Sequence, residues 1–124
     1  MAVKRTVNTL LGCALFLAMC AAAAPGGGHY YMYAGTYTGP ASKGIYAFRY
    51  DIKGVSFQPL GVAAEMPQPS FLAVHPNGRF LYAVSELGND GTTDGLVYSF
   101  AIDPETGKLT FLNKTSSGGG GACH

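Results

Sequence analysis

Seven short apolar runs follow one another along the chain beyond residue 28, each bounded by glycine, proline, asparagine or aspartate. Their side chains are mainly valine, isoleucine, tyrosine, phenylalanine and threonine, which favour strands. No stretch beyond residue 25 repeats its apolar positions with a helical period over three turns. The pattern therefore predicts an all-β chain with strands at 29–35, 44–51, 55–63, 70–75, 79–85, 95–103 and 108–115.

The connections between these runs are of two kinds, which alternate along the chain. Tight turns, in which glycine supplies a positive φ and aspartate or asparagine supports the turn, are expected at 51–54, 76–79 and 103–108. Longer loops are expected at 36–44, 86–95 and 115–122. Alternate connections of an antiparallel meander lie at the same end, so we expect all the long loops at one end, where binding residues usually lie.

A repeat of about 50 residues underlies the pattern. The stretch YAFRYDIKG at 46–54 aligns with YSFAIDPETG at 98–107, and YYMYAG at 30–35 aligns with RFLYAV at 79–84. Four antiparallel strands at this period are typical of a β-propeller blade. The alternative is a small β-sandwich whose hairpins look alike by chance, but tight turns recur at matching positions and count against it.

Residues 1–24 have the layout of a secretory signal peptide, with a basic start, an apolar stretch and a run of small residues. We expect cleavage after Ala22 or Ala23 and a flexible, glycine-rich start at 25–29, which predicts a periplasmic or extracellular protein. The alternative is an uncleaved membrane anchor. Two polar residues shorten the apolar part below the roughly 20 residues that a spanning helix needs.

Removal of this segment changes the charge and the cysteine count. Cleavage removes two of the eight basic residues. Six basic and seven acidic residues then remain, so the net charge changes from +1 to −1. We expect no nucleic-acid partner and, after cleavage, no membrane partner. Cys123 is then the only cysteine, which excludes an internal disulfide and favours a buried structural thiol.

Four stretches together carry a resemblance to a known family: YAGTYT…KGIYAFRYD, PSFLAVHPNGRFLYAVSE, GLVYSFAIDPETGKLTFLN and GGGACH. Over residues 30–124 the chain resembles the N-terminal region of the seven-bladed propeller lactonases, the 6-phosphogluconolactonase-like propellers. The resemblance implies one blade at 30–69, a second at 70–121 and the start of a third at 122–124.

Because a propeller needs at least four blades to close, this division predicts an incomplete fragment whose remaining blades are partners outside the chain. We expect the fragment to be inactive and, because repeat units bury their faces against neighbours, poorly soluble alone.

The resemblance also implies hydrolysis of a small-molecule lactone, a reaction that needs a base for water and donors for the developing oxyanion. His124 matches the histidine that family members carry in CH or TH at this blade opening, so it is the first catalytic candidate. Glu86, at the head of a long loop, is the second, as a base or as a ligand for a sugar hydroxyl. Thr36 and Tyr37 occupy the equivalent place in the first blade and are expected to bind substrate. The alternatives are a structural histidine and a solvated loop carboxylate.

Other function classes stay open. The export signal favours a lactone other than the phosphorylated one, or a carboxylated lactone as for a muconate-lactone-type cyclase relative. Lys43 and Lys114 are the only evident cations for a phosphate at the long-loop end, and arginines of the absent blades are the alternative source of such cations. A non-catalytic propeller that binds a small ligand or a protein, and a short exported β-domain, are the other interpretations. We expect no cofactor and no metal, because the adjacent Cys123 and His124 lack two further ligands.

Overall fold

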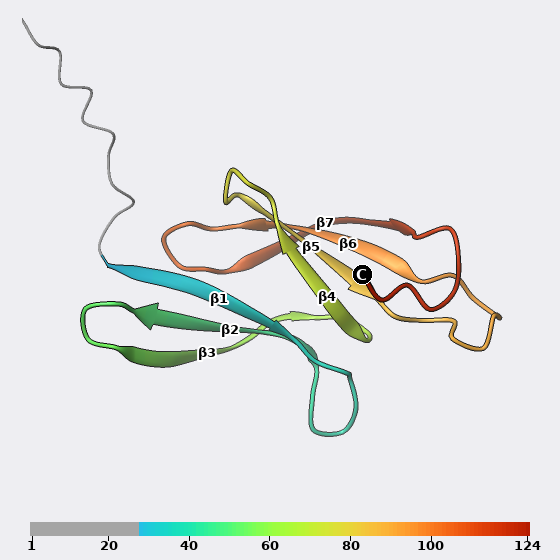
Figure 1. Cartoon of the computed structure of the whole chain (residues 1–124), viewed down its shortest axis with the longest axis horizontal. Helices are drawn as coiled ribbons and strands as arrows, with labels where there is room; N and C mark the ends of the chain where they lie inside the picture. Colours follow the sequence, from blue (N-terminus) through green and yellow to red (C-terminus); the bar gives the residue numbers. More distant parts are fainter. Residues whose placement is uncertain (1–27) are drawn as a thin grey trace, which may run out of the picture.

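The computed structural model describes residues 28–124 and contains seven strands, close to those expected (Figure 1). They are β1 (His29–Gly35), β2 (Gly44–Asp51), β3 (Ser56–Glu65), β4 (Pro69–Val74), β5 (Phe80–Ser85), β6 (Leu96–Ile102) and β7 (Leu109–Ser116). The prediction of an all-β chain is confirmed, with each strand end within two residues of its expected place. Within residues 28–124 no helix is long and apolar enough to span a membrane.

Two predicted N-terminal features fall largely outside this description. The signal peptide at 1–24 lies outside the described residues, as does most of the glycine-rich start at 25–29. His29, the last residue of that start, is the first residue of β1, and Ile52 N–H donates to the Gly28 carbonyl at 2.8 Å.

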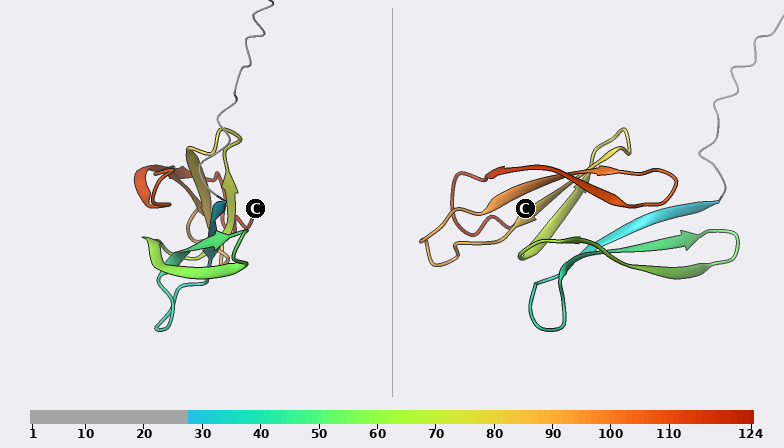
Figure 2. Two further views of the ribbon diagram at one scale, coloured as in Figure 1. Left: turned by 90° about the vertical axis from the view of Figure 1, so that its left-hand side faces the viewer. Right: turned by 180° about the vertical axis from the view of Figure 1, so that it is seen from behind.

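The strands form two antiparallel sheets in which sequence neighbours pair throughout. The first sheet has the order β1-β2-β3 and the second the order β4-β5-β6-β7. Seen from behind, the sheets lie as two layers (Figure 2). The β2–β3 and β6–β7 turns lie at one end and the long loops at the other (Figure 1), as the alternating connections predict.

Aspartate side chains support the two equivalent tight turns. The Asp51 carboxylate accepts a hydrogen bond from the Lys53 N–H at 2.8 Å. The Asp103 carboxylate accepts one from the Glu105 N–H at 2.9 Å. Such turns direct each hairpin straight back, which fixes β3 beside β2 and β7 beside β6.

Each sheet has two chemically different faces, because successive side chains of a strand point to opposite sides. In β2, Tyr46 and Phe48 share one face, while Ile45 and Ala47 share the other. The repeat-equivalent residues of β6 divide in the same way: Tyr98 and Phe100 share one face, and Val97 and Ser99 the other. We call these the aromatic face and the aliphatic face of each sheet.

The core lies where the aliphatic face of the first sheet meets the aromatic face of the second. Its buried members come from both sheets and from the connection between them, and are Ile45, Met66, Leu81, Ala83, Tyr98 and Phe100. Phe111 on β7 extends the aromatic side, with its ring centroid 6.0 Å from that of Phe100. Because removal of apolar surface from water is favourable, burial of this cluster stabilises the two sheets against each other.

Two tyrosines of β1 attach the first sheet to the β6–β7 turn. Tyr33 Oη donates to the Gly107 carbonyl at 2.8 Å, and Tyr31 Oη donates to the Glu105 carbonyl at 2.5 Å. Gly107 has φ +69°, and the Tyr31 ring occupies the space that a Cβ there would need. Burial, with smaller contributions from Tyr31 and Asp103, raises the pKa of Tyr33 to about 12.

The Tyr33 phenol predicts a loss of stability at high pH. In the unfolded chain it ionises near pH 10, but in the folded chain only near pH 12. Its contribution is therefore complete below pH 10 and is lost as the pH rises towards 12. Tyr33→Phe should remove this part of the pH dependence and lose about 1 kcal/mol of hydrogen bonding at neutral pH. Thermal unfolding midpoints between about pH 7 and pH 12 measure both effects.

The control is Tyr30→Phe, on the same strand but with a side chain that is exposed. It should keep the wild-type pH dependence. An identical slope for Tyr33→Phe and the wild type above pH 10 would contradict the role given to Tyr33.

Candidate active site

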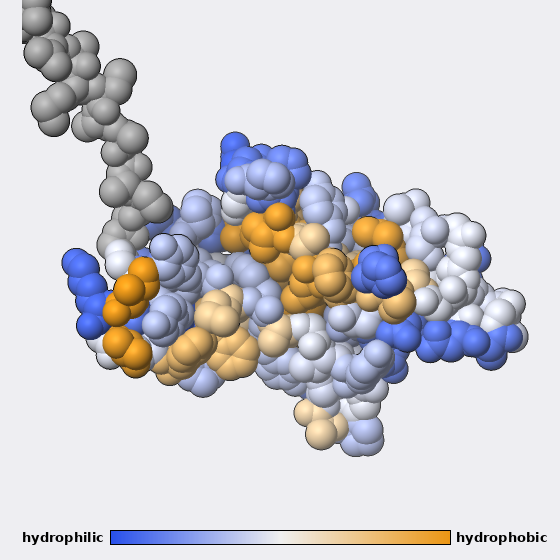
Figure 3. Space-filling model, viewed as in Figure 1, coloured by the Kyte–Doolittle hydropathy of each residue, from blue (hydrophilic) through white to orange (hydrophobic). Residues whose placement is uncertain are grey.

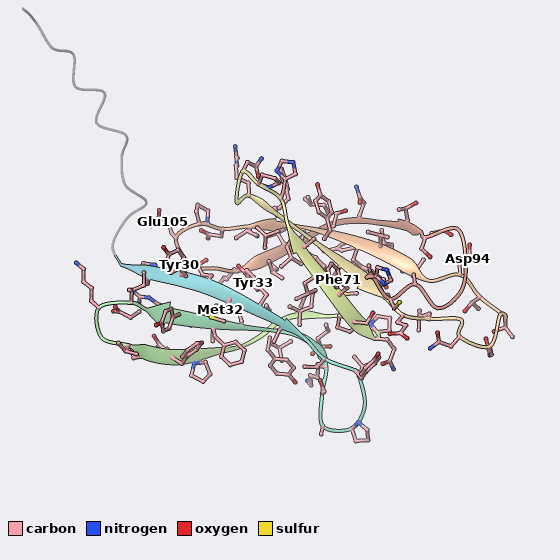
Figure 4. All side chains as sticks on the ribbon, in the orientation of Figure 1. Tyr30, Met32, Tyr33, Phe71, Asp94 and Glu105 are labelled. Atoms are coloured by element: carbon pink, nitrogen blue, oxygen red, sulfur yellow. The ribbon has the colours of Figure 1, made fainter. Side chains whose placement is uncertain are left out.

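The long-loop end is held together by backbone hydrogen bonds between segments far apart in sequence. Glu86 N–H donates to the Gln68 carbonyl at 2.9 Å, which ties the start of loop 86–95 to the connection between the sheets. Gly121 N–H donates to the Leu87 carbonyl at 2.7 Å, so the C-terminal segment follows the same loop. Figure 4 shows Asp94 at this end and Glu105 at the opposite one. The loops therefore form one connected surface.

Tyr37 and Glu86 meet at this surface. Tyr37 Oη donates to Glu86 Oε2 at 2.8 Å. The two residues hold equivalent positions of the repeat, one from each sheet, so the contact bridges neighbouring sheets. The hydrogen bond to the Glu86 carboxylate and its negative charge raise the pKa of the Tyr37 phenol. The structure thus brings together two of the four residues expected at the site.

An open hollow of about 520 Å³ lies beside this pair. Its lining includes Tyr37, Gln68, Glu86 and the following loop through Thr93. Asp90 also lines it, and hydrogen bonds from the Thr92 hydroxyl and N–H lower the pKa of the Asp90 carboxyl. Two carboxylates therefore face the hollow, and it attracts neutral polar groups or cations more than anions.

The two lysines expected at this end are engaged elsewhere. Lys43 Nζ pairs with Glu65 Oε1 at 3.2 Å. Lys114 Nζ lies 5.5 Å from the centroid of the Tyr98 ring, on the aromatic face of the second sheet. Among the residues that line the hollow there is no lysine or arginine.

Thr36 has a role within its own loop. Its Oγ1 donates to the Gly44 carbonyl at 2.7 Å and also contacts the Ser42 hydroxyl, and its N–H donates to the same carbonyl at 3.1 Å. These contacts close the loop 36–43 at its base. Binding of substrate by Thr36 stays a prediction.

His124 and Cys123 lie together at the end of the chain, and both are exposed. Cys123 Sγ is 3.2 Å from His124 Nδ1. The prediction of a buried thiol is therefore wrong, because within residues 28–124 no element covers this segment. His124 does not line the hollow, although Cys123 is near enough to Tyr37 to add to the raised pKa of its phenol. The catalytic role of His124 stays a prediction.

Two residues of this end could not be identified from the sequence. Asn89 Nδ2 lies 3.5 Å from Glu86 Oε1 and so contacts the second oxygen of that carboxylate. Gln68 has a φ of +46°, unusual for a residue with a side chain, and its Nε2 donates to the Thr38 carbonyl at 3.4 Å. The sequence predicts that Asn89 lies in the loop 86–95, but the orientation of the Asn89 side chain depends on the conformation of that loop. Among residues 28–124, no group of three His, Cys, Asp or Glu side chains could hold a metal ion.

Comparison with known proteins identifies the family. The family model "Lactonase, 7-bladed beta-propeller" matches residues 31–124 of this chain. The chain belongs to this family. The predicted resemblance is thereby confirmed, and the two sheets are blades of a propeller.

Individual relatives agree with this assignment. The chain is 34% identical over 95 residues to the 6-phosphogluconolactonase of Bacillus subtilis (strain 168), a match that covers 77% of this chain and 26% of that protein. A putative 6-phosphogluconolactonase from Bacteroides uniformis superposes with a TM-score of 0.69 at 38% identity, over 77% of this chain and 27% of its own. The periplasmic gluconolactonase of Pseudomonas aeruginosa gives 0.63 at 35% identity, over 72% and 25%. The chain thus spans about a quarter of the length of the relatives it matches.

Proposed function

We propose that this chain supplies part of the active site of an exported hydrolase that acts on an unphosphorylated sugar lactone. The observation that carries the proposal is the Tyr37–Glu86 hydrogen bond, which joins a phenol and a carboxylate from neighbouring blades at the edge of an open hollow. Family membership supports lactone chemistry, since named relatives are 6-phosphogluconolactonases and a gluconolactonase.

In the proposed reaction, the Glu86 carboxylate takes a proton from a water molecule as that water attacks the lactone carbonyl carbon. The carbonyl oxygen becomes an oxyanion, which hydrogen-bond donors stabilise. The bond between the carbonyl carbon and the ring oxygen then breaks, and the proton returns to that oxygen. The product is an open-chain hydroxy acid, which ionises and releases a proton to the solvent. Tyr37 holds the carboxylate in place, and His124 is the second candidate for the base.

The choice of an unphosphorylated substrate rests on charge. The hollow is lined by Glu86 and Asp90, while Lys43 and Lys114 are engaged with Glu65 and the Tyr98 ring. A phosphate beside these two carboxylates would be repelled. The periplasmic gluconolactonase of Pseudomonas aeruginosa is a relative whose name includes no phosphate.

The proposal also requires further blades. Because the chain spans about a quarter of its relatives, we expect the site to be completed by residues outside these two sheets, and the chain alone to be inactive. The functional test therefore needs a chimera. Residues 31–124 would replace the matching quarter of the Pseudomonas aeruginosa gluconolactonase, whose remaining blades complete the ring.

The chimera should hydrolyse gluconolactone, and Glu86→Gln should lower its kcat by about 100-fold because the base is lost. Tyr37→Phe should lower it less, because the carboxylate stays in place. Acid release in a weakly buffered indicator solution follows the reaction directly. The matched control is Glu65→Gln, the same change at an exposed carboxylate outside the hollow.

Three results would contradict the proposal. They are full activity of the Glu86→Gln chimera, an equal loss in the Glu65→Gln control, and lactone hydrolysis by the isolated chain. A preference of the chimera for the 6-phosphorylated lactone would reject the proposed substrate while leaving the base assignment intact.

Export is the remaining part of the proposal. It rests on the layout of residues 1–24 and on the periplasmic location in the name of one relative. Expressed in a Gram-negative host, the protein should be found in the periplasmic fraction with a new N-terminus after Ala22 or Ala23. Edman sequencing or intact mass reads that terminus, and an intact Met1 in the cytoplasmic fraction would reject export.

A further inference from the structure

Backbone hydrogen bonds hold the segment after β7 against loop 86–95. Ser117 N–H donates to the Gly95 carbonyl at 2.9 Å, and Gly121 N–H donates to the Leu87 carbonyl at 2.7 Å. In Figure 1 this segment turns back beside the loop between β5 and β6. Figure 3 shows hydrophilic and near-neutral residues at the outer tip of this end. Both segments leave strands of the second sheet, so the contact lies within one blade.

Gly120 lies in this contact with no room for a side chain. A Cβ there would overlap the Gly88 carbonyl oxygen and lie 3.1 Å from the Thr93 carbonyl oxygen. A larger residue would therefore push the two segments apart. Gly119, its neighbour, has nothing within 4 Å of the same position. The φ of neither glycine lies in the left-handed region, so the two differ in the space around them and not in a need for positive φ.

Gly121 meets the same loop next to the Glu86 carboxylate. A Cβ at Gly121 would lie 2.7 Å from Asn89 Oδ1. The other end of that amide, Asn89 Nδ2, lies 3.5 Å from Glu86 Oε1. Tyr37 Oη donates to the second carboxylate oxygen, Oε2, at 2.8 Å. The glycine segment therefore lies directly behind the amide that contacts Glu86.

We propose that Gly120 and Gly121 are positioning residues for the Glu86 carboxylate. Because they have no side chains, the segment after β7 lies directly against the loop and holds the Asn89 amide at Oε1, while Tyr37 holds Oε2. The inference rests on the proposed function for its effect on the rate, but not for its effect on the contact between Tyr37 and Glu86. A general base must lie within hydrogen-bond reach of the water that it deprotonates, and a displacement of about 1 Å can cost about 100-fold in rate.

The test compares two neighbouring glycines in the chimera that carries residues 31–124. Gly120→Ala should lower kcat for gluconolactone by about 10-fold, because the carboxylate is displaced but not removed. Gly119→Ala is the matched control. It should keep the kcat of the unsubstituted chimera, because its new methyl group meets no other atom.

A second measurement follows the contact between Tyr37 and Glu86 without any catalysis. The hydrogen bond to Glu86 and the charge of that carboxylate raise the pKa of the Tyr37 phenol above its ordinary value of 10.0. In Gly120→Ala this pKa should fall back towards the ordinary value, as it should in Glu86→Gln. In Gly119→Ala it should stay raised. NMR of isotopically labelled tyrosine, with the Tyr37 signal identified by its loss in Tyr37→Phe, measures the titration.

Asn89→Ala tests the same arrangement without adding an atom. It should lower kcat several-fold, because one side of the carboxylate is no longer held. Asn113→Ala, the same change at an exposed asparagine of β7, is its control. If the Gly120→Ala chimera loses its β-sheet signal in circular dichroism, this pair decides the question. Equal rates for the two asparagine variants would then overturn the proposal.

The failures of this proposal and of the proposed function are distinguishable. If Gly120→Ala matches Gly119→Ala in both kcat and the Tyr37 pKa, the positioning role is wrong, whether both variants are active or both are impaired. That result leaves Glu86 as the base. Full activity of Glu86→Gln would reject the base instead, and a Tyr37 pKa that stays raised in Gly120→Ala would then overturn the positioning role as well.

Discussion

Packing of the aromatic face of the second sheet against the aliphatic face of the first is the interaction on which the rest of this structure depends. The sheets share no strand, and a short connection at 66–68 joins them. What holds them in position is the buried cluster around Ile45, Leu81 and Phe100, with the Tyr33 hydroxyl bonded across it. Apolar burial is not directional, so the hydrogen bonds at the edge set the alignment.

The candidate active site depends on this packing because it is built across it. Tyr37 follows β1 and Glu86 follows β5, so neither sheet alone contains the pair. A small rotation of one sheet against the other would separate a phenol and a carboxylate that are 2.8 Å apart. The apolar contact between the sheets therefore fixes the relative positions of the two polar residues at the long-loop end. This is how a propeller can build one site from loops of several blades.

Local sequence signals predicted the strands well, because each run is limited by turn residues such as Asp51 and Asp103 whose side chains support the turn directly. The repeat also placed Tyr37 and Glu86 at equivalent positions. It could not show that they touch, because that contact depends on the angle between the sheets. The exposure of Cys123 was missed for a similar reason, since burial depends on elements that pack from outside the local sequence. Gln68 and Asn89 owe their orientation to loop geometry, which has no periodic pattern in the sequence.

The most direct test of this account is a double-mutant cycle between Ile45 and Phe100, read by urea unfolding. Both side chains are almost fully buried in the cluster that joins the sheets. If this contact holds the sheets together, the effects of Ile45→Ala and Phe100→Ala should be coupled by about 1 kcal/mol. Effects that simply add, within about 0.5 kcal/mol, would mean that the two residues stabilise their own sheets separately. The central role given to the interface would then be wrong.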